Sequence, residues 1–232
     1  MSGTPVIEMR NIAKSFLGVK ALRGVSFACG RGEVHALCGE NGAGKSTLIK
    51  VLSGVHKPNE GEILIDGTVQ HFGHPQEALL AGISVIYQEF SLLPERTVAQ
   101  NLFLGREPRR NGLIDSRAMI EETRRVLDLF GVRHGITPDT LVADLDVASQ
   151  QMVEIAKAIS LNAKVIVMDE PTAALNEAEC EVLFKLVDQL RASGTAIIYI
   201  THRMQEVTRL ADRVTVIKDG EAVASFDHVP AP

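Results

Sequence analysis

The stretch that decides the fold is Gly39-Glu40-Asn41-Gly42-Ala43-Gly44-Lys45-Ser46-Thr47. It fits the pattern G-x-x-x-x-G-K-[ST], whose glycines let consecutive backbone N–H groups turn inward around a chain of phosphates. The apolar run Val34–Cys38 before it predicts a strand, and the apolar residues after it recur at helical spacing. A glycine-rich turn with a surface lysine is the plain alternative. The strand and the helix on either side favour a nucleotide site.

Each residue type in this stretch suits a phosphate chain and its metal ion. Lys45 is predicted to reach the β- and γ-phosphates, and the Ser46 hydroxyl to ligate Mg²⁺. The helix that follows adds its positive N-terminal end. The predicted nucleotide-binding residues are Gly39, Glu40, Asn41, Gly42, Ala43, Gly44, Lys45, Ser46 and Thr47.

The composition is that of an ordinary globular protein. Apolar residues make up 45% and charged residues 23% of 232 residues, which is enough for one large α/β domain or two small ones. The net charge of −5 provides no basic footprint for a nucleic-acid backbone. Cys29, Cys38 and Cys180 match no metal or redox spacing and predict reduced cytosolic thiols. The sequence has neither a signal-peptide pattern nor an apolar run of about 18 residues. If the protein serves a membrane process, we therefore expect it to do so as a peripheral partner.

The remaining patterns place strands at both ends of the chain and helices between them. Strands are predicted at 6–9, 22–27, 165–168, 196–200 and 214–217, with hairpins turned on Asp66-Gly67 and Asp219-Gly220. From about 97 to 161 the pattern is helical. Ser116 is predicted to cap a helix that Gly131 ends, and its apolar face comprises Met119, Ile120, Val126, Leu127 and Phe130. Further helices are predicted near 150–161 and near 177–192, the second closed by Gly194.

A pair of carboxylates follows the apolar strand at 165–168. In a phosphate-loop fold this strand ends beside the nucleotide, so Asp169 can hold Mg²⁺ through water. Glu170, one residue further, can polarise an attacking water as a general base. A strand that ends at a polar turn is the alternative, and the phosphate loop in the same chain favours the functional interpretation.

Over nearly its whole length the chain resembles the nucleotide-binding domain of ABC transporters. Phe16 matches the aromatic residue that stacks on adenine, Gln88 the glutamine of the Q-loop, and His202 the switch histidine that contacts the γ-phosphate. Taken singly, Phe16 could be a core residue, and Gln88 and His202 polar residues at strand ends. The resemblance implies an α/β P-loop NTPase with a mixed sheet core (about 1–88 and 162–226), an antiparallel β subdomain, an inserted helical subdomain (about 89–161) and a linker-like tail (227–232).

The resemblance also implies roles for residues of the site. It makes Glu170, His202 and Lys45 catalytic, assigns Mg²⁺ to Ser46, Gln88 and Asp169, and names ATP and Mg²⁺ as cofactors. Three segments, 88–94, 101–107 and 150–157, resemble the carbohydrate-importer branch, which includes the ATPases of ribose, galactose and xylose uptake. This implies an N-terminal cassette that works with a second cassette, fused or separate, and with a membrane permease. It also implies an indirect link to an extracytoplasmic sugar-binding protein, and a location on the cytoplasmic face of the membrane.

One part of the sequence departs from the family pattern. The signature L-S-G-G-Q, which binds ATP held by the opposite cassette, is Leu145-Asp146-Val147-Ala148-Ser149 here, and residues 173–176 lack the usual serine and aspartate of the D-loop. A carboxylate at position 146 would repel a phosphate. Asp146 or Ser149 could instead serve as a helix N-cap. We therefore expect low ATPase activity of the isolated chain. Two alternatives stay open: a poorly hydrolytic regulatory half of a cassette pair, and a soluble ABC ATPase acting on nucleic acid or ribosomes.

Overall fold

The computed structural model describes residues 4–129 and 135–227. The chain divides into two compact units. The first comprises Met1–Val85, Ala163–Glu170 and Val187–Pro232, and the second Ile86–Asn162 and Pro171–Leu186. Phe130, Gly131 and residues 228–232 of the predicted tail lie outside the described residues, whereas Asp227 is the last residue of a strand and does not belong to a linker.

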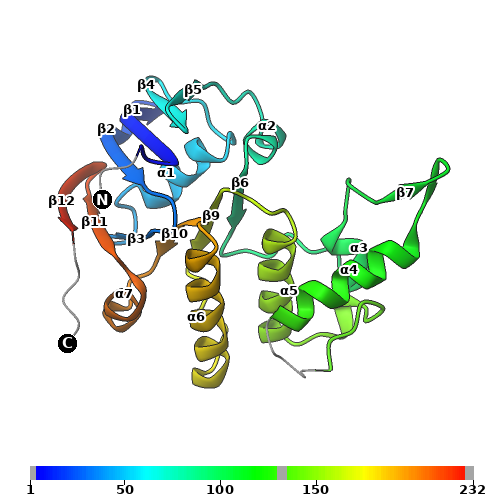
Figure 1. The fold of residues 1–232 in the computed structure, drawn as a ribbon. Coiled ribbons are helices and arrows are strands. Elements are labelled where there is room, and N and C mark those ends of the chain that lie inside the picture. Colours follow the sequence, from blue (N-terminus) through cyan, green and yellow to red (C-terminus); the bar gives the residue numbers. More distant parts are fainter. Residues whose placement is uncertain (1–3, 130–134, 228–232) are drawn as a thin grey trace. The chain divides into compact units, whose positions relative to one another are not determined.

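A six-stranded mixed sheet, most of which belongs to the first unit, carries the phosphate loop (Figure 1). Its order is β12 (Glu221–Asp227), β11 (Arg213–Lys218), β3 (Val34–Cys38), β10 (Ala196–Ile200), β9 (Val165–Asp169) and β6 (Ile83–Ile86). Strands β11, β3, β10 and β9 run parallel, and they confirm the strands predicted at 34–38, 165–168, 196–200 and 214–217. In the register, Ile200 lies opposite both Leu37 and Asp169. The segments that follow β3, β9 and β10 therefore leave the sheet at one edge.

The second sheet of the first unit is antiparallel. Its order is β2 (Val19–Cys29), β1 (Ile7–Phe16), β4 (Glu60–Ile65) and β5 (Thr68–Gln70), and the turn on Asp66-Gly67 is confirmed. The strands predicted at 6–9 and 22–27 are present, but their predicted lengths were wrong, because β1 has 10 residues and β2 has 11. Strand β1 pairs on both sides and continues through register shifts around Asn11, whose φ is 49°. Because the length of β1 depends on its pairing with β2 and β4, the sequence of β1 alone does not predict where the strand ends.

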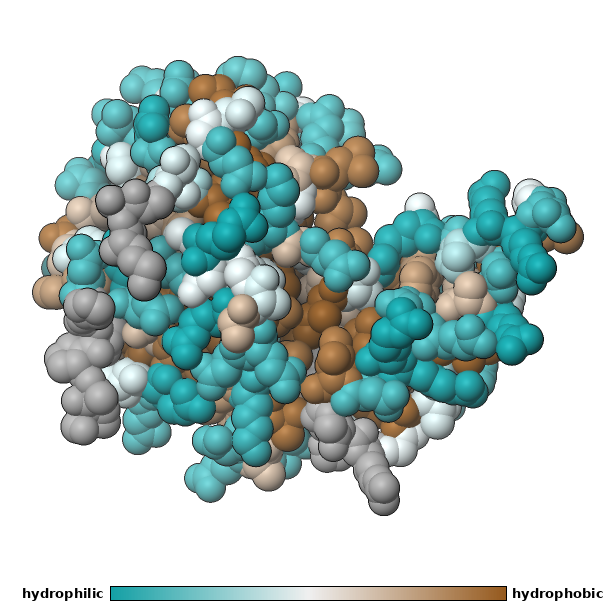
Figure 2. Space-filling model, in the orientation of Figure 1, coloured by the Kyte–Doolittle hydropathy of each residue, from teal (hydrophilic) through white to brown (hydrophobic). Residues whose placement is uncertain are grey.

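The helices around the sheet match the sequence pattern closely. α1 (Lys45–Leu52) buries Leu48, Ile49, Val51 and Leu52, as their spacing predicts. α6 (Glu177–Ala192) has the predicted bounds and continues from the second unit into the first. The shorter helices are α2 (Pro75–Leu80) and α7 (Met204–Leu210). Figure 2 shows an apolar patch over α2, where Leu80 is 81% exposed. None of the helices within 4–129 and 135–227 is long and apolar enough to span a bilayer.

The second unit is mainly helical, with one small hairpin. Its helices are α3 (Val98–Leu102), α4 (Ser116–Leu129), a 3₁₀ turn (Val142–Asp144) and α5 (Val147–Ile159), and α3 packs against both α4 and α5. The purely helical prediction for 97–161 was wrong, because β7 (Arg109–Arg110) and β8 (Leu113–Ile114) form a hairpin. The prediction that Ser116 caps α4 was also wrong. Asp115 accepts the N–H of Ala118 at 3.0 Å, and Ser116 is the first helical residue.

A buried histidine joins the two sheets of the first unit. The Nδ1 atom of His35, on β3, lies 2.7 Å from the carbonyl oxygen of Ala28 on β2, so Nδ1 must carry the proton. Nε2 of the neutral ring therefore accepts the hydroxyl proton of Thr215 on β11, at 2.8 Å. Burial lowers the pKa of His35 from 6.5 to about 4. At neutral pH this side chain is an uncharged link between the sheets.

We expect the buried His35 to make the first unit sensitive to acid. An unfolded imidazole takes up its proton near pH 6.5 and the folded one near 4, so the unfolded chain binds more protons between these values. The free energy of unfolding should fall by about 3 kcal/mol as the pH is lowered through this window. Glu33, whose pKa burial raises, acts in the opposite direction and offsets part of the loss.

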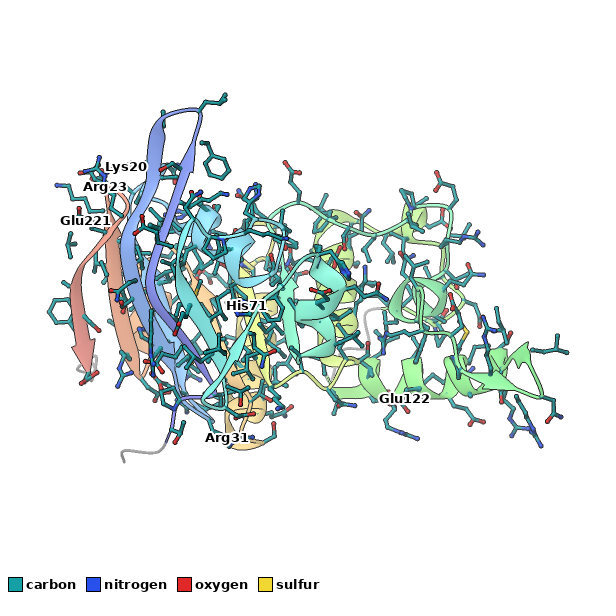
Figure 3. All side chains as sticks on the ribbon, turned by 90° about the horizontal axis from the view of Figure 1, so that it is seen from above. Lys20, Arg23, Arg31, His71, Glu122 and Glu221 are labelled. Carbon is teal, nitrogen blue, oxygen red and sulfur yellow. The ribbon has the colours of Figure 1, made fainter. Side chains whose placement is uncertain are left out.

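Chemical denaturation at pH 7 and pH 4.5 measures this effect. The variant His35→Gln should show a shallower pH dependence than the wild type, and its amide can still donate to Ala28. His71→Gln, which removes an exposed histidine (Figure 3), controls for the loss of one imidazole. An equal slope in the His35→Gln variant and the wild type would contradict the assignment.

Candidate nucleotide site

The phosphate loop connects the carboxyl end of β3 to α1. Gly44 is the N-cap residue of α1 and has a φ of 111°, in the left-handed region that favours glycine. It has no side chain with which to cap the helix, so the N–H groups of the first turn remain for a ligand. Ala43 is buried, whereas Glu40, Asn41, Gly42 and Ser46 are exposed and Thr47 is half-buried.

Lys45 is folded inward onto its own loop. Its side chain is buried, and Nζ donates to the carbonyl oxygens of Gly39 at 2.7 Å and Glu40 at 3.0 Å. The ammonium group thus closes a ring between the first residue of α1 and the first two residues of the loop. This ring holds a positive charge among the turns of the loop, which is the property that a phosphate-binding loop requires.

Asp169 ends β9 at the same edge of the sheet. Burial raises the pKa of its carboxyl group above the ordinary value, and the neighbouring Glu170 raises it further, while the charges of Lys45 and Lys50 lower it. Lys45 is therefore close enough to Asp169 for their charges to interact. A half-buried carboxylate beside a lysine and a helix N-terminus suits a divalent cation, whose charge would offset the cost of ionising it.

Glu170 holds a strained backbone position and contacts His202. Its φ of 49° is uncommon for a residue with a side chain, and its N–H donates to the carbonyl oxygen of Ile200 at 3.0 Å. One carboxylate oxygen lies 3.0 Å from Nδ1 of His202. The carboxylate is the acceptor, so Nδ1 carries the proton. This contact brings together two residues that are 32 positions apart in the sequence.

Phe16 is a surface residue at the end of β1. Its side chain is 38% exposed, so the alternative that Phe16 is a core residue was wrong. The ring meets His56 edge-on with centroids 5.0 Å apart, and Nζ of Lys14 lies 5.2 Å from its centroid. The ring is therefore held at the surface by the contact with His56, and the ammonium group of Lys14 lies over it.

Gln88 and Asp146 belong to the second unit. Gln88 is exposed just after β6. Asp146 is the N-cap of α5, where it accepts the N–H of Ser149 at 2.8 Å, so of the two predicted caps Asp146 is correct and Ser149 is wrong. This carboxylate therefore already has a partner in the helix that it begins.

The three sequence segments that resemble the sugar-importer branch are joined to one another in the second unit. Glu154 accepts the backbone N–H of Ser91, and Lys157 donates to the Ser91 hydroxyl at 3.0 Å. Asn101, which is fully buried, both donates to and accepts from the backbone of Leu93. These residues hold the loop at 88–94, which the sequence alone did not reveal.

Solved structures share this fold. A nucleotide-free ATP-binding cassette from an ABC transporter superimposes with a TM-score of 0.84 at 29% identity, over 97% of this chain and 92% of that one. The ADP conformation of MJ1267, another ATP-binding cassette, has a TM-score of 0.83 at 29% identity, again over 97% and 92%. The family model described as ABC transporter matches residues 22–173. The chain belongs to the ABC transporter family.

Within the ABC family, named sugar-import proteins are close relatives. The ribose import ATP-binding protein RbsA 1 of Rubrobacter xylanophilus is 52% identical over 94% of this chain and 44% of its own length. The arabinose import ATP-binding protein AraG of Mannheimia succiniciproducens is 49% identical over 97% of this chain and 44% of its own length. The chain thus spans less than half the length of these curated relatives.

Proposed function

We propose that this chain binds MgATP and hydrolyses it as the ATP-binding part of a sugar importer. The observation that carries the proposal is the gathering of the phosphate loop, Asp169, Glu170 and His202 at one edge of one sheet. The names of the relatives, which import ribose and arabinose, support a sugar as the substrate.

In this proposal the loop and two further side chains hold the nucleotide and its metal ion. Backbone N–H groups of Gly39–Thr47 and the ammonium group of Lys45 bind the phosphates, and the exposed Phe16 stacks on the base. Ser46, Asp169 and Gln88 supply oxygen ligands for Mg²⁺, which neutralises charge on the phosphates when bound. Among the described residues no three His, Cys, Asp or Glu side chains gather as a metal cage. Such sparse protein ligands fit Mg²⁺, which takes substrate phosphates and waters to complete its shell.

Glu170 and His202 then perform the proton chemistry. Glu170 accepts a proton from the attacking water, and the hydrogen bond from His202 orients its carboxylate. In the neutral imidazole Nε2 is an acceptor, and in the charged form it is a second donor that can meet a phosphate oxygen. The φ of 49° at Glu170 is the kind of strained backbone position that is found at active sites.

The proposal extends to domains, partners and location. A β and phosphate-loop core (about 1–88 and 162–226) would bind the nucleotide, with an inserted helical subdomain (about 89–161). The region of Gln88 would face the membrane permease at the cytoplasmic surface. A second cassette completes the pair, and a sugar-binding protein delivers the sugar to the permease.

Titration with nucleotides tests the binding step. MgATP and MgADP should bind far more tightly than adenosine, because the loop recognises phosphates. Equal affinity for all three would remove the basis of the proposal. Binding to DNA or RNA that weakens steeply with salt would instead favour the soluble nucleic-acid ATPase.

A poorly hydrolytic regulatory half is the second candidate, and Asp146 is the observation that favours it. Its carboxylate stands at the N-terminus of α5, where the family signature presents a serine to phosphate. A negative charge there would repel the phosphate of ATP bound to a partner cassette. We therefore propose that the isolated chain, pairing with a second copy of itself, hydrolyses ATP slowly.

Restoring the signature is expected to speed this hydrolysis. The double variant Asp146→Ser with Ala148→Gly should raise steady-state ATP turnover about tenfold, by removing roughly 1.4 kcal/mol of repulsion. Serine is as good an N-cap as aspartate, so α5 keeps its first turn. Asp146→Asn serves as the control that removes the charge and keeps the cap. Unchanged turnover in both variants would rule out the repulsion.

A further inference from the structure

The turn between β11 and β12 touches the phosphate loop, although it lies some 175 residues further along the chain. The N–H of Gly220 donates to the carbonyl oxygen of Ala43 at 2.9 Å. The carbonyl oxygen of Gly220 accepts the N–H of Arg23, on β2, at 2.8 Å. One glycine therefore connects the loop to a strand of the other sheet through its backbone alone.

The approach is so close that side chains are excluded on both sides. A methyl group at Gly220 would lie 2.8 Å from the carbonyl oxygen of Ala21, and one at Gly44 would lie 2.8 Å from the same oxygen. A methyl group at Gly39 would lie 2.2 Å from the carbonyl oxygen of Ile217, at the end of β11. The loop is thus held between the backbone of β2 and the backbone of the β11–β12 hairpin.

This clamp fixes the direction of an N–H group in the loop. In a trans peptide the C=O and the N–H point in opposite directions. The carbonyl of Ala43 points to Gly220, so the N–H of Gly44, in the same peptide unit, points to the opposite side. That direction leads away from the hairpin.

We propose that Gly220 is a positioning residue for nucleotide phosphates, acting through Ala43. This inference rests on the proposed binding of ATP by the loop. Gly220 itself does not touch the nucleotide; its hydrogen bond holds the Ala43–Gly44 peptide in the orientation that presents an N–H to phosphate. The side chains that flank the clamp point elsewhere: Arg23 and Glu221 line one groove at this edge of the unit (Figure 3).

The chain contains a matched control for this clamp. Gly67 is the second residue of the other Asp-Gly turn and has a φ of 79°, against 80° for Gly220. A methyl group at Gly67 would meet only Thr4, at 3.7 Å. Alanine at either position carries the same left-handed backbone penalty, and only alanine at Gly220 disturbs the phosphate loop.

Displacement of a fluorescent ATP analogue by MgATP tests the proposal. Gly220→Ala should raise the dissociation constant about tenfold, the value of one buried hydrogen bond, whereas Gly67→Ala should change it less than about twofold. Equal affinities in the two variants would overturn the clamp while leaving nucleotide binding intact. Absence of MgATP binding by the wild type would overturn the proposed function and the clamp together.

Hydrogen exchange of the wild type keeps the proposal testable should Gly220→Ala fail to fold. MgATP should slow amide exchange both in 39–47 and in the turn at 218–221, because a phosphate on the loop stabilises the clamp. The turn at 66–67 provides the internal reference and should not change. Protection of the loop without protection of 218–221 would overturn the coupling.

Discussion

Replacing Lys45 by methionine is expected to weaken MgATP binding about a hundredfold. Hydrogen bonds from a charged donor contribute about 1.5–3 kcal/mol each, and the upper end of that range corresponds to two orders of magnitude in affinity. Methionine keeps the length of the buried stem, so the packing of α1 should survive. Calorimetric titration with MgATP measures the loss directly.

Lys50→Met is the matched control for this substitution. Lys50 lies on the same helix, is exposed, and like Lys45 lowers the pKa of Asp169. The two variants therefore lose the same charge near the same carboxylate. If both weakened binding equally, the general field at this edge of the sheet, and not the position of Lys45 in the loop, would account for the affinity.

Glu170→Gln is expected to lower the rate of ATP hydrolysis about a thousandfold and to leave MgATP affinity within about threefold. General acid–base catalysis contributes a factor of about 10²–10⁴, and glutamine cannot take a proton from water. Its amide oxygen can still accept the N–H of His202, so the local geometry should persist. Single-turnover measurements with the chain in excess over ATP separate the chemical step from product release.

Glu177→Gln provides the control, because Glu177 is exposed in the first turn of α6. Its turnover should match the wild type. A Glu170→Gln variant that hydrolyses ATP at the wild-type rate would show that another base serves the reaction and would favour the binding-only alternative. If Glu170→Gln lowered both the affinity for MgATP and the rate of hydrolysis, Glu170 would contribute to binding of the substrate and not only to the chemical step.

The local sequence predicted much of the fold because short-range signals dominate in its parallel core. Apolar runs marked β3, β9, β10 and β11, and the spacing of apolar residues marked α1 and α6. It failed for the lengths of β1 and β2, which depend on their pairing with other strands. It also missed the β7–β8 hairpin, although the Asn111-Gly112 turn is a local hairpin signal, because the surrounding pattern is helical.

The functional and supporting residues also fall into two groups, those that the local sequence predicts and those that it does not. The loop, the Asp169–Glu170 pair and His202 could be named from motifs, since each follows a recognisable strand. Asn101 and Glu154 could not, because their partners are backbone groups 8 and 63 residues away. Both side chains are buried. In the sequence, this burial is visible only as a polar residue within an apolar helical pattern.

By itself the sequence determined that the chain carries a phosphate-binding loop between a strand and a helix, because glycine, lysine and hydroxyl residues at that spacing have few other uses. Only the tertiary structure decided how the loop is supported. Gly220 looked like an ordinary turn residue, the same as Gly67, until the two hairpins were seen to have different neighbours. Hydrogen bonds between backbone groups require no particular side chain, so the contact that distinguishes these two glycines is not encoded in their local sequence.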